Sequence, residues 1–299
     1  MFDTVPQLDC AGRILRLDVP RVMGIVNVTP DSFSDGGAHF DAAAAVAHGL
    51  RLAAEGADLL DVGGESTRPG ADEVPLEEEL RRVVPVVERL AKETSLPISV
   101  DTSRPEVMRA AVDAGAGMLN DVYALRREGA LDAAAELGVP VVLMHMLGEP
   151  RSMQDAPEYD DVVGEVHRFL AERIFVAEMA GIARKRIVVD PGFGFGKSTQ
   201  HNLQLLAQLE RFTELGVPVL AGLSRKRTIG ELTGRDAPAE RLHGSVAAHL
   251  VAAQRGAGIV RVHDVGATVD ALKVWRAVAA VPTPRKAADA PAIRWPDEI

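Results

Sequence analysis

Short apolar runs alternate with amphipathic stretches along most of this chain, and that alternation limits the folds open to it. Each run is nearly continuously apolar, as a parallel strand covered on both faces must be. Eight runs qualify as strands: 22–28, 57–63, 97–101, 118–122, 141–146, 186–192, 217–224 and 259–265. Apolar residues recur at helical spacing between them, in 41–55, 76–91, 105–114, 161–180, 203–215, 241–255 and 268–280. Pro85 lies inside one predicted helix and is expected to bend it.

Eight strands alternating with helices predict an α/β fold, a single closed (β/α)8 TIM barrel. The alternative is an open, doubly wound sheet. The number of strands favours the barrel, and so does the lack of a dinucleotide-binding fingerprint. The glycine-rich stretch DPGFGFGKS (190–198) comes nearest, but its glycines are spaced by twos. Pro191 also stands where a nucleoside-triphosphate loop needs its first glycine.

The chain ends are expected to lie outside the barrel. Residues 1–20 precede the first barrel strand and are predicted to form a small hairpin or plug. Residues 21–280 would form the barrel. Residues 281–299 are rich in proline, alanine and charge, which is typical of a mobile tail. We find no linker that would divide the 299 residues into two domains.

Composition excludes several classes of partner. The net charge of −10 argues against a broad nucleic-acid-binding surface. No uncharged apolar run approaches the ~18 residues of a membrane helix, and the N-terminus does not resemble a signal peptide. Cys10 is the single cysteine, so no intrachain disulfide is possible, which fits a reducing compartment. We therefore expect a cytoplasmic protein that binds neither nucleic acid nor membranes.

Polar side chains gather where the apolar runs end. The carboxyl ends of barrel strands meet at one face, and the chemistry of such barrels takes place there. A single aspartate at a strand end can equally cap the next helix, so each one alone permits both interpretations. Together they predict a functional face. The residues are Asn27, Asp61, Asp101, Asn120, Asp121, His145, Asp190, the segment 224–226, Arg261 and His263.

These polar groups are of two kinds. Asp101, Asn120 and Asp190 suit a heterocycle with a guanidine-like edge, because a carboxylate accepts two parallel hydrogen bonds from such an edge. A second set is cationic and suits phosphate or pyrophosphate: Lys226, Arg261, His263 and Arg68. The triplet 225–227 could instead be a solvated charge run. The loops 29–37 and 65–75 are candidate mobile lids or ordinary surface loops.

A series of motifs resembles the dihydropteroate synthase family. They are MGIVNVTPDSFSDGG (23–37), DVGGESTRPGA (61–71), SVDTSRPEV (99–107), NDV (120–122), LMHM (143–146), DPGFGFGK (190–197), GLSRKRTIGELTG (222–234) and RVHDV (261–265). The resemblance implies a homodimeric (β/α)8 barrel and a transferase of folate biosynthesis that is the target of sulfonamides. Its reaction joins 6-hydroxymethyl-7,8-dihydropterin pyrophosphate to 4-aminobenzoate, giving 7,8-dihydropteroate and pyrophosphate.

The resemblance also implies site residues, position by position. The pterin would contact Asp101, Asn120, Met144, Asp190, Phe195, Gly222 and Lys226. Pyrophosphate would contact Asn27, Arg68, Arg261 and His263, with Asn27 also holding Mg²⁺. The 4-aminobenzoate would meet Phe33, Thr67, Pro69, Ser224 and Arg225. Catalysis would rest on Asp101, Lys226 and Asp35, with pyrophosphate leaving before the amine attacks.

Two positions depart from the family pattern, and two other functions compete. Leu147 stands where the family often has glutamine, and Arg227 varies between members. Neither change removes a catalytic group. The alternatives are a corrinoid-dependent methyltetrahydrofolate methyltransferase and a non-catalytic pterin-binding paralogue. The Arg261 and His263 pair and the loop 29–37 favour the synthase. Helices late in the chain are the candidates for a dimer interface.

Overall fold

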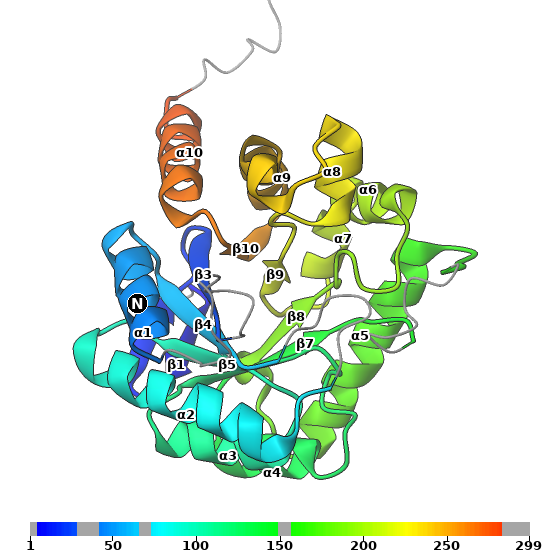
Figure 1. The fold of residues 1–299 in the computed structure, drawn as a ribbon. Coiled ribbons are helices and arrows are strands. Elements are labelled where there is room, and N and C mark those ends of the chain that lie inside the picture. Colours follow the sequence, from blue (N-terminus) through cyan, green and yellow to red (C-terminus); the bar gives the residue numbers. More distant parts are fainter. Residues whose placement is uncertain (1–4, 29–41, 66–72, 149–156, 283–299) are drawn as a thin grey trace, which may run out of the picture.

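A computed structural model describes residues 5–28, 42–65, 73–148 and 157–282. Eight parallel strands close into a barrel in the order β10-β3-β4-β5-β6-β7-β8-β9 (Figure 1). Their bounds are β3 Arg21–Asn27, β4 Leu59–Gly63, β5 Ile98–Asp101, β6 Met118–Asp121, β7 Val141–Met144, β8 Ile187–Asp190, β9 Val219–Ala221 and β10 Ala257–Val262. The predicted barrel is confirmed. The open-sheet alternative is wrong, because β10 pairs in parallel with β3.

Helices surround the barrel, as Figure 1 shows. They are α1 Ala42–Ala54, α2 Leu76–Glu93, α3 Pro105–Asp113, α4 Ala130–Leu137, α5 Val162–Met179, α6 Thr199–Ala207, α7 Glu210–Thr213, α8 Arg227–Thr233, α9 Leu242–Gln254 and α10 Val265–Ala279. The 3₁₀ turns η2 Arg184–Arg186 and η3 Pro238–Arg241 join neighbouring elements. Within the described part of the chain, no helix is long and apolar enough to cross a membrane.

Three helical features differ from the sequence pattern. The segment 203–215 was predicted as one helix but forms α6 and α7, because Gln208 leaves the helical region with φ −118° and ψ 28°. Helix α4 was not predicted, since it buries only alanines and alanine gives a weak apolar signal. The polar α8 was missed for a similar reason. The bend predicted at Pro85 stays a prediction, and helix α2 includes this residue in its interior.

The predicted N-terminal hairpin is confirmed. Strands β1 Gln7–Cys10 and β2 Arg13–Arg16 pair antiparallel. The buried hairpin side chains Leu8, Cys10 and Leu15 pack with residues from the early part of seven barrel strands. These are Met23, Leu59, Met118, Val142, Val188, Leu220 and Ile259. The hairpin therefore covers the end of the barrel opposite the polar strand ends.

Candidate active site

The barrel brings the predicted polar residues to one face. Asn27, Asp101 and Asp190 are each the last residue of a strand. Asn120 lies beside Asp101 in the parallel pairing of β5 with β6. Arg261 stands one residue before the end of β10. The closure of the barrel thus assembles one set of side chains from residues as far apart in the sequence as Asn27 and Arg261.

A buried ion-pair network occupies this face. Arg261 donates from Nε to Asp61 Oδ2 at 2.6 Å and from Nη2 to Asp101 Oδ2 at 2.7 Å. Asn120 Nδ2 donates to the same Asp61 oxygen at 3.0 Å. Asp61 is fully buried. Sequence reasoning placed Asp61 among the strand-end residues without a role, and the cost of burying an unpaired carboxylate was the signal that could have identified its partner.

Burial raises the pKa of the two carboxylates predicted to hold the pterin. Desolvation raises the pKa of Asp101 to about 7, although the Arg261 guanidinium opposes the shift. Desolvation also raises the pKa of Asp190, against the charge of Lys226 and a 2.7 Å hydrogen bond from Gly192 N. Charged hydrogen-bond donors on a ligand would favour the ionised form of both. Perturbed carboxyl groups of this kind are typical of functional sites.

Lys226 and Phe195 form an adjoining surface. The Lys226 ammonium donates to the carbonyl of Phe193 and lies 4.5 Å from the centroid of the Phe195 ring. Burial lowers the pKa of Lys226 to about 8. Phe195 packs on a small buried cluster formed by Val122, Met144 and Met146. Two predicted pterin contacts, Met144 and Phe195, are therefore together, beside the predicted cation.

The glycine-rich stretch after β8 needs its glycines for close backbone contact. Gly192 has φ +71°, and a Cβ there would stand 1.9 Å from the carbonyl oxygen of His145. Ser198 caps α6, its side chain accepting from His201 N at 3.2 Å. Lys197 turns inward instead, with Nζ 2.9 Å from His145 Nδ1 and 2.9 Å from the carbonyl oxygen of Phe195. The buried Lys197 side chain therefore links the glycine-rich turn to His145.

Two of the predicted strand-end residues, His145 and Asp121, have structural roles. Burial lowers the pKa of His145 to about 2, so its ring is neutral beside Lys197. Asp121 accepts hydrogen bonds from Ser103 Oγ and from the backbone of Tyr123 and Leu125 at 2.8 and 2.7 Å. Asp121 thus stabilises the turn after β6, but the helix-capping interpretation is wrong for it, because α4 begins only at Ala130 with Gly129 as its N-cap.

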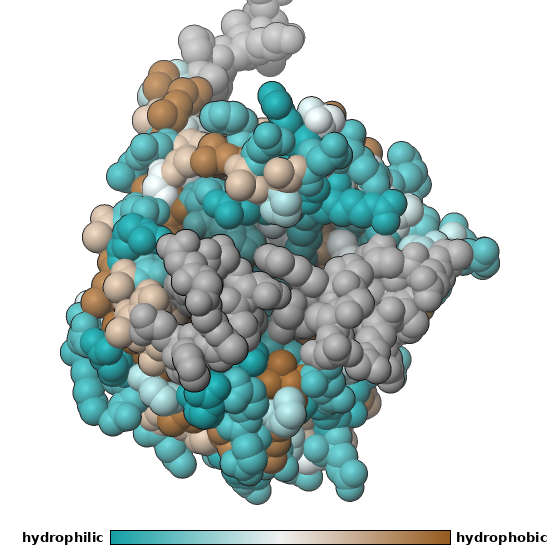
Figure 2. Space-filling model, in the orientation of Figure 1, coloured by the Kyte–Doolittle hydropathy of each residue, from teal (hydrophilic) through white to brown (hydrophobic). Residues whose placement is uncertain are grey.

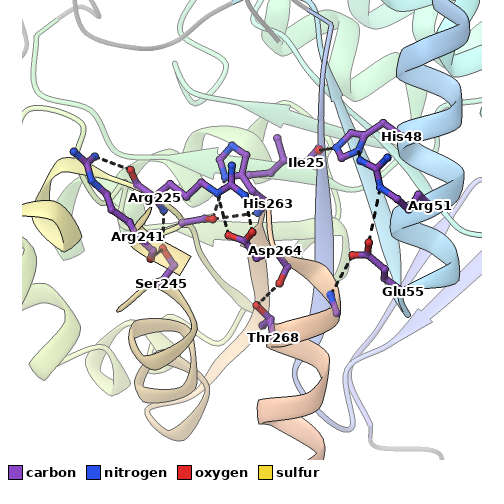
Figure 3. Close-up of polar contacts among 12 residues, drawn as sticks. Ile25, His48, Arg51, Glu55, Arg225, Arg241, Ser245, His263, Asp264 and Thr268 are labelled. Carbon is purple, nitrogen blue, oxygen red and sulfur yellow. Dashed lines mark hydrogen bonds and ion pairs between the residues drawn. The ribbon is translucent and has the colours of Figure 1, made fainter. Parts of the chain in front are cut away.

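The loop between β9 and α8 carries Ser224, Arg225 and Lys226. Hydrogen bonds to residues outside this loop hold it in place. Ser224 Oγ accepts from His263 N at 3.1 Å and lies 2.9 Å from His263 Nδ1. Arg225 has φ +56° and donates from Nε to Asp264 at 3.0 Å, as Figure 3 shows. Its backbone N–H donates to Ser245 Oγ of α9 at 2.9 Å (Figure 3). The loop therefore holds Ser224 and His263 together.

The basic triplet is only partly a solvated charge run. The Arg225 side chain is tied to Asp264, and Lys226 is held against Phe193 and Phe195. Arg227 is different, because its side chain is 78% exposed and pairs with Glu231 one turn along α8. The solvated interpretation is thus wrong for the first two residues and right for the third.

Several predicted positions fall outside the described residues. They are Phe33, Asp35, Thr67, Arg68 and Pro69. Gly222 follows β9, and Asn27 ends β3 with a half-buried side chain. Among the residues that are described, no group of three His, Cys, Asp or Glu side chains could hold a metal ion.

Known proteins match the chain over nearly its full length. A family model described as pterin binding enzyme matches residues 23–263. Dihydropteroate synthase of Escherichia coli (strain K12) is 54% identical over 268 residues, which cover 90% of this chain and 95% of the relative.

Two solved structures of dihydropteroate synthase from Xanthomonas albilineans extend the comparison. The structure with 4-aminobenzoic acid is 75% identical, with a TM-score of 0.90 over 93% of this chain and 100% of that chain. The structure in complex with 7,8-dihydropteroate is 71% identical, with a TM-score of 0.86 and the same coverage of both chains. The family model spans most of the chain and the relatives are covered almost completely, so the chain belongs to the dihydropteroate synthases of the pterin-binding enzyme family.

Proposed function

We propose that the protein joins 6-hydroxymethyl-7,8-dihydropterin pyrophosphate to 4-aminobenzoate, giving 7,8-dihydropteroate and pyrophosphate. The observation that carries the proposal is the set of Asp101, Asn120 and Asp190 on one face of the barrel, with Lys226 over Phe195 beside it. The similar protein of Xanthomonas albilineans, whose structures contain 4-aminobenzoic acid or 7,8-dihydropteroate, supports this choice. The relatives are named synthases, which favours this activity over the corrinoid methyltransferase and the non-catalytic paralogue.

The pterin ring is assigned to the carboxylate side of the face. Asp190 would accept paired hydrogen bonds from the guanidine-like edge of the ring, a geometry that suits a carboxylate. Asn120 offers an amide whose orientation is already set by Asp61. Phe195 and Met144 would cover the flat apolar surface of the ring. The ammonium of Lys226 lies close enough to Phe195 to reach a polar atom of the same ligand.

The pyrophosphate is assigned to Arg261, His263 and Asn27. Arginine and histidine donors suit phosphate oxygens. Asn27 supplies an amide oxygen, a ligand type that Mg²⁺ accepts, and Mg²⁺ is often bound by one or two protein groups together with substrate phosphates. When bound, Mg²⁺ would offset the negative charge of the phosphates. These assignments place the anion on the β3 and β10 side of the face.

The reaction is proposed to begin with loss of pyrophosphate. The C–O bond to the pterin methylene breaks, and its electron pair leaves with the pyrophosphate. The amino nitrogen of 4-aminobenzoate then bonds to the methylene carbon and releases a proton. Asp101 would stabilise the positive charge on the pterin between these steps, as preorganised charges do in active sites. Ser224 and Arg225 would border the 4-aminobenzoate.

The reaction needs no covalent bond to the protein. Cys10 lies in the hairpin at the opposite end of the barrel, where burial raises the pKa of its thiol to about 12. A protonated thiol at that distance from the strand carboxyl ends has no part in the chemistry.

A pyrophosphate-release assay tests the proposed activity. Purified protein is given the pterin pyrophosphate, 4-aminobenzoate and Mg²⁺, and released pyrophosphate is followed with a coupled enzyme. We expect release that depends on 4-aminobenzoate and stops on removal of Mg²⁺ by a chelator. Folded protein that releases no pyrophosphate in response to 4-aminobenzoate would refute the assignment.

We further infer that two copies associate through late helices. Val274 and Val278 of α10 are 67% and 68% exposed, Val281 just beyond it is 63% exposed, and Val251 of α9 is 36% exposed. Figure 2 shows apolar side chains gathered near the end of α10. Exposed apolar groups that lie together are typical of an association surface. A second copy of this chain is the occupant that the family resemblance implies.

A further inference from the structure

Arg261 joins two carboxylates that differ in access. Its Nε lies 2.6 Å from Asp61 and its Nη2 lies 2.7 Å from Asp101. The Asp61 side chain is fully buried, whereas that of Asp101 retains 11% exposure and that of Arg261 retains 21%. A ligand that arrives at the face can therefore reach Asp101 but not Asp61. One guanidinium compensates both carboxylates in this state.

Asp61 also orients an amide. The oxygen that accepts from Arg261 Nε accepts from Asn120 Nδ2 at 3.0 Å, so one buried atom holds a residue assigned to pyrophosphate and a residue assigned to the pterin. The other oxygen, Oδ1, has no hydrogen-bond partner among the described residues.

We propose that Asp61 is a positioning residue, the fixed anchor on which Arg261 turns from Asp101 to the pyrophosphate when the pterin binds. The inference rests on the proposed function. A pterin that donates hydrogen bonds to Asp101 replaces Arg261 Nη2 there. The Nε bond to Asp61 keeps the guanidinium at the site, and Nη2 is then directed to an anion.

The exchange follows from the cost of unpaired buried charge. A guanidinium N–H that loses a carboxylate must gain another acceptor or pay a desolvation cost. Pyrophosphate supplies that acceptor. The two halves of the substrate would then bind with positive coupling, and the coupling must be reciprocal because it is a free energy.

Binding to the wild-type protein tests this coupling without any substitution. The affinity of Mg²⁺ pyrophosphate is measured by calorimetry alone and with saturating 6-hydroxymethylpterin, which lacks phosphate. We expect pyrophosphate to bind about tenfold more tightly to the pterin-bound protein, within the usual range of coupling between sites. An unchanged or weaker affinity would overturn the proposal.

A double-mutant cycle tests the anchor. Asp61→Asn keeps the side-chain shape, and we expect it to abolish the coupling measured above. In an Arg261→Gln background the same substitution should have no further effect on pyrophosphate affinity, because the residue through which Asp61 acts is missing. Independent, additive losses in the two backgrounds would mean that Asp61 has only a structural role.

A matched control is available in Glu79, another fully buried carboxylate, which accepts from Thr102 at 2.6 Å. Glu79→Gln should retain the coupling even where it lowers stability. If Asp61→Asn does not fold, Arg261→Lys decides in its place, since lysine cannot hold both partners through one planar group and should lose the coupling. Active wild-type protein without coupling would reject this inference alone, whereas wild-type protein inactive in the pyrophosphate-release assay would reject the proposed function.

Discussion

Four aspartates stand at or near the ends of barrel strands, and their surroundings give them different tasks. Asp121 accepts hydrogen bonds from the Ser103 hydroxyl and from the backbone of the turn that follows β6. Asp61 is fully buried beneath Arg261 and Asn120. Asp101 and Asp190 retain some exposure, 11% for the Asp101 side chain and 7% for Asp190, whereas Asp61 and Asp121 have none. The same residue type therefore stabilises a turn, anchors other side chains or is a candidate ligand contact, according to the donors around it.

Substitution of the two candidate pterin carboxylates should separate binding from turnover. Asp190→Ala removes an acceptor pair and is expected to weaken pterin binding about thirtyfold or more, as for charged hydrogen bonds. Asp101→Asn removes the negative charge and should lower kcat about a hundredfold with a smaller effect on binding. Calorimetry with 6-hydroxymethylpterin and steady-state kinetics measure the two effects. Equal losses of affinity with unchanged kcat in both variants would contradict the division.

The pH dependence of kcat/KM should be a narrow bell. Asp101 must be ionised, so activity should rise with pH through about 7. Lys226 must be protonated, so activity should fall as pH rises through about 8. Because kcat/KM reports on the free enzyme, both pKa values refer to the unliganded protein. The two groups interact, so the observed pKa values belong to the pair. The measurement is kcat/KM for the pterin substrate from pH 5 to 10.

Lys226→Arg is the matched variant for this profile. Arginine stays charged over the whole range, so the basic limb should disappear while the acidic limb remains. A wild-type profile without change between pH 6 and 9 would show that neither group controls the reaction.

At the scale of elements, the β9–α8 loop shows how a helix from late in the chain supports the site. His249 of α9 is fully buried and accepts from Leu223 N at 3.1 Å through Nε2. Burial lowers the pKa of His249 to about 4, which keeps the ring neutral and able to accept this bond. Ser245, one turn earlier on α9, accepts from the backbone of Arg225. Helix α9 therefore sets the backbone that presents Ser224 and Lys226.

The contact between the N-terminal hairpin and the barrel should be sensitive to a single methyl group added to the barrel. A Cβ at Gly117, just before β6, would lie 2.4 Å from the carbonyl oxygen of Cys10. Gly117→Ala would force the hairpin away from the barrel end, and we expect a loss of about 1–3 kcal/mol in the free energy of unfolding. Urea denaturation measures the change.

Gly258 in β10 provides the matched control for this substitution. A Cβ there would meet its nearest neighbours at 3.8 Å, an ordinary contact. Gly258→Ala should therefore change stability little. Equal stability of the two variants would show that the hairpin does not need close contact with Gly117.

At the scale of the whole molecule, the exposed valines of α10 lead to a prediction about association. A charge buried in an interface is costly, so Val274→Asp combined with Val278→Asp should shift the protein from dimer toward monomer. Sedimentation over a range of concentrations measures the shift. Substitution of Val251 on α9 should matter less, because this side chain is only 36% exposed. A wild-type protein that stays monomeric at high concentration would contradict the proposed dimer.

Local pattern in the sequence was sufficient to predict the barrel and much of its candidate site. Every predicted strand is present, because two-sided burial imposes continuous apolar runs that can be read residue by residue. The rule that strand carboxyl ends share one face then grouped Asp101, Asn120 and Asp190 correctly. The missed elements were those with little local signal, such as the alanine-lined α4.

Tertiary structure alone decided which polar residues pair. Arg261 and Asp61 lie 200 positions apart in the chain, and His145 and Lys197 lie 52 apart. Closure of the barrel and the turn after β8 create these contacts, so no local period records them. By itself the sequence determined where strands run and where polar groups emerge from them. The division of those groups into buried anchors, turn-stabilising acceptors and partly exposed carboxylates was decided by the fold, because only packing sets the solvent access and the partners of each charge.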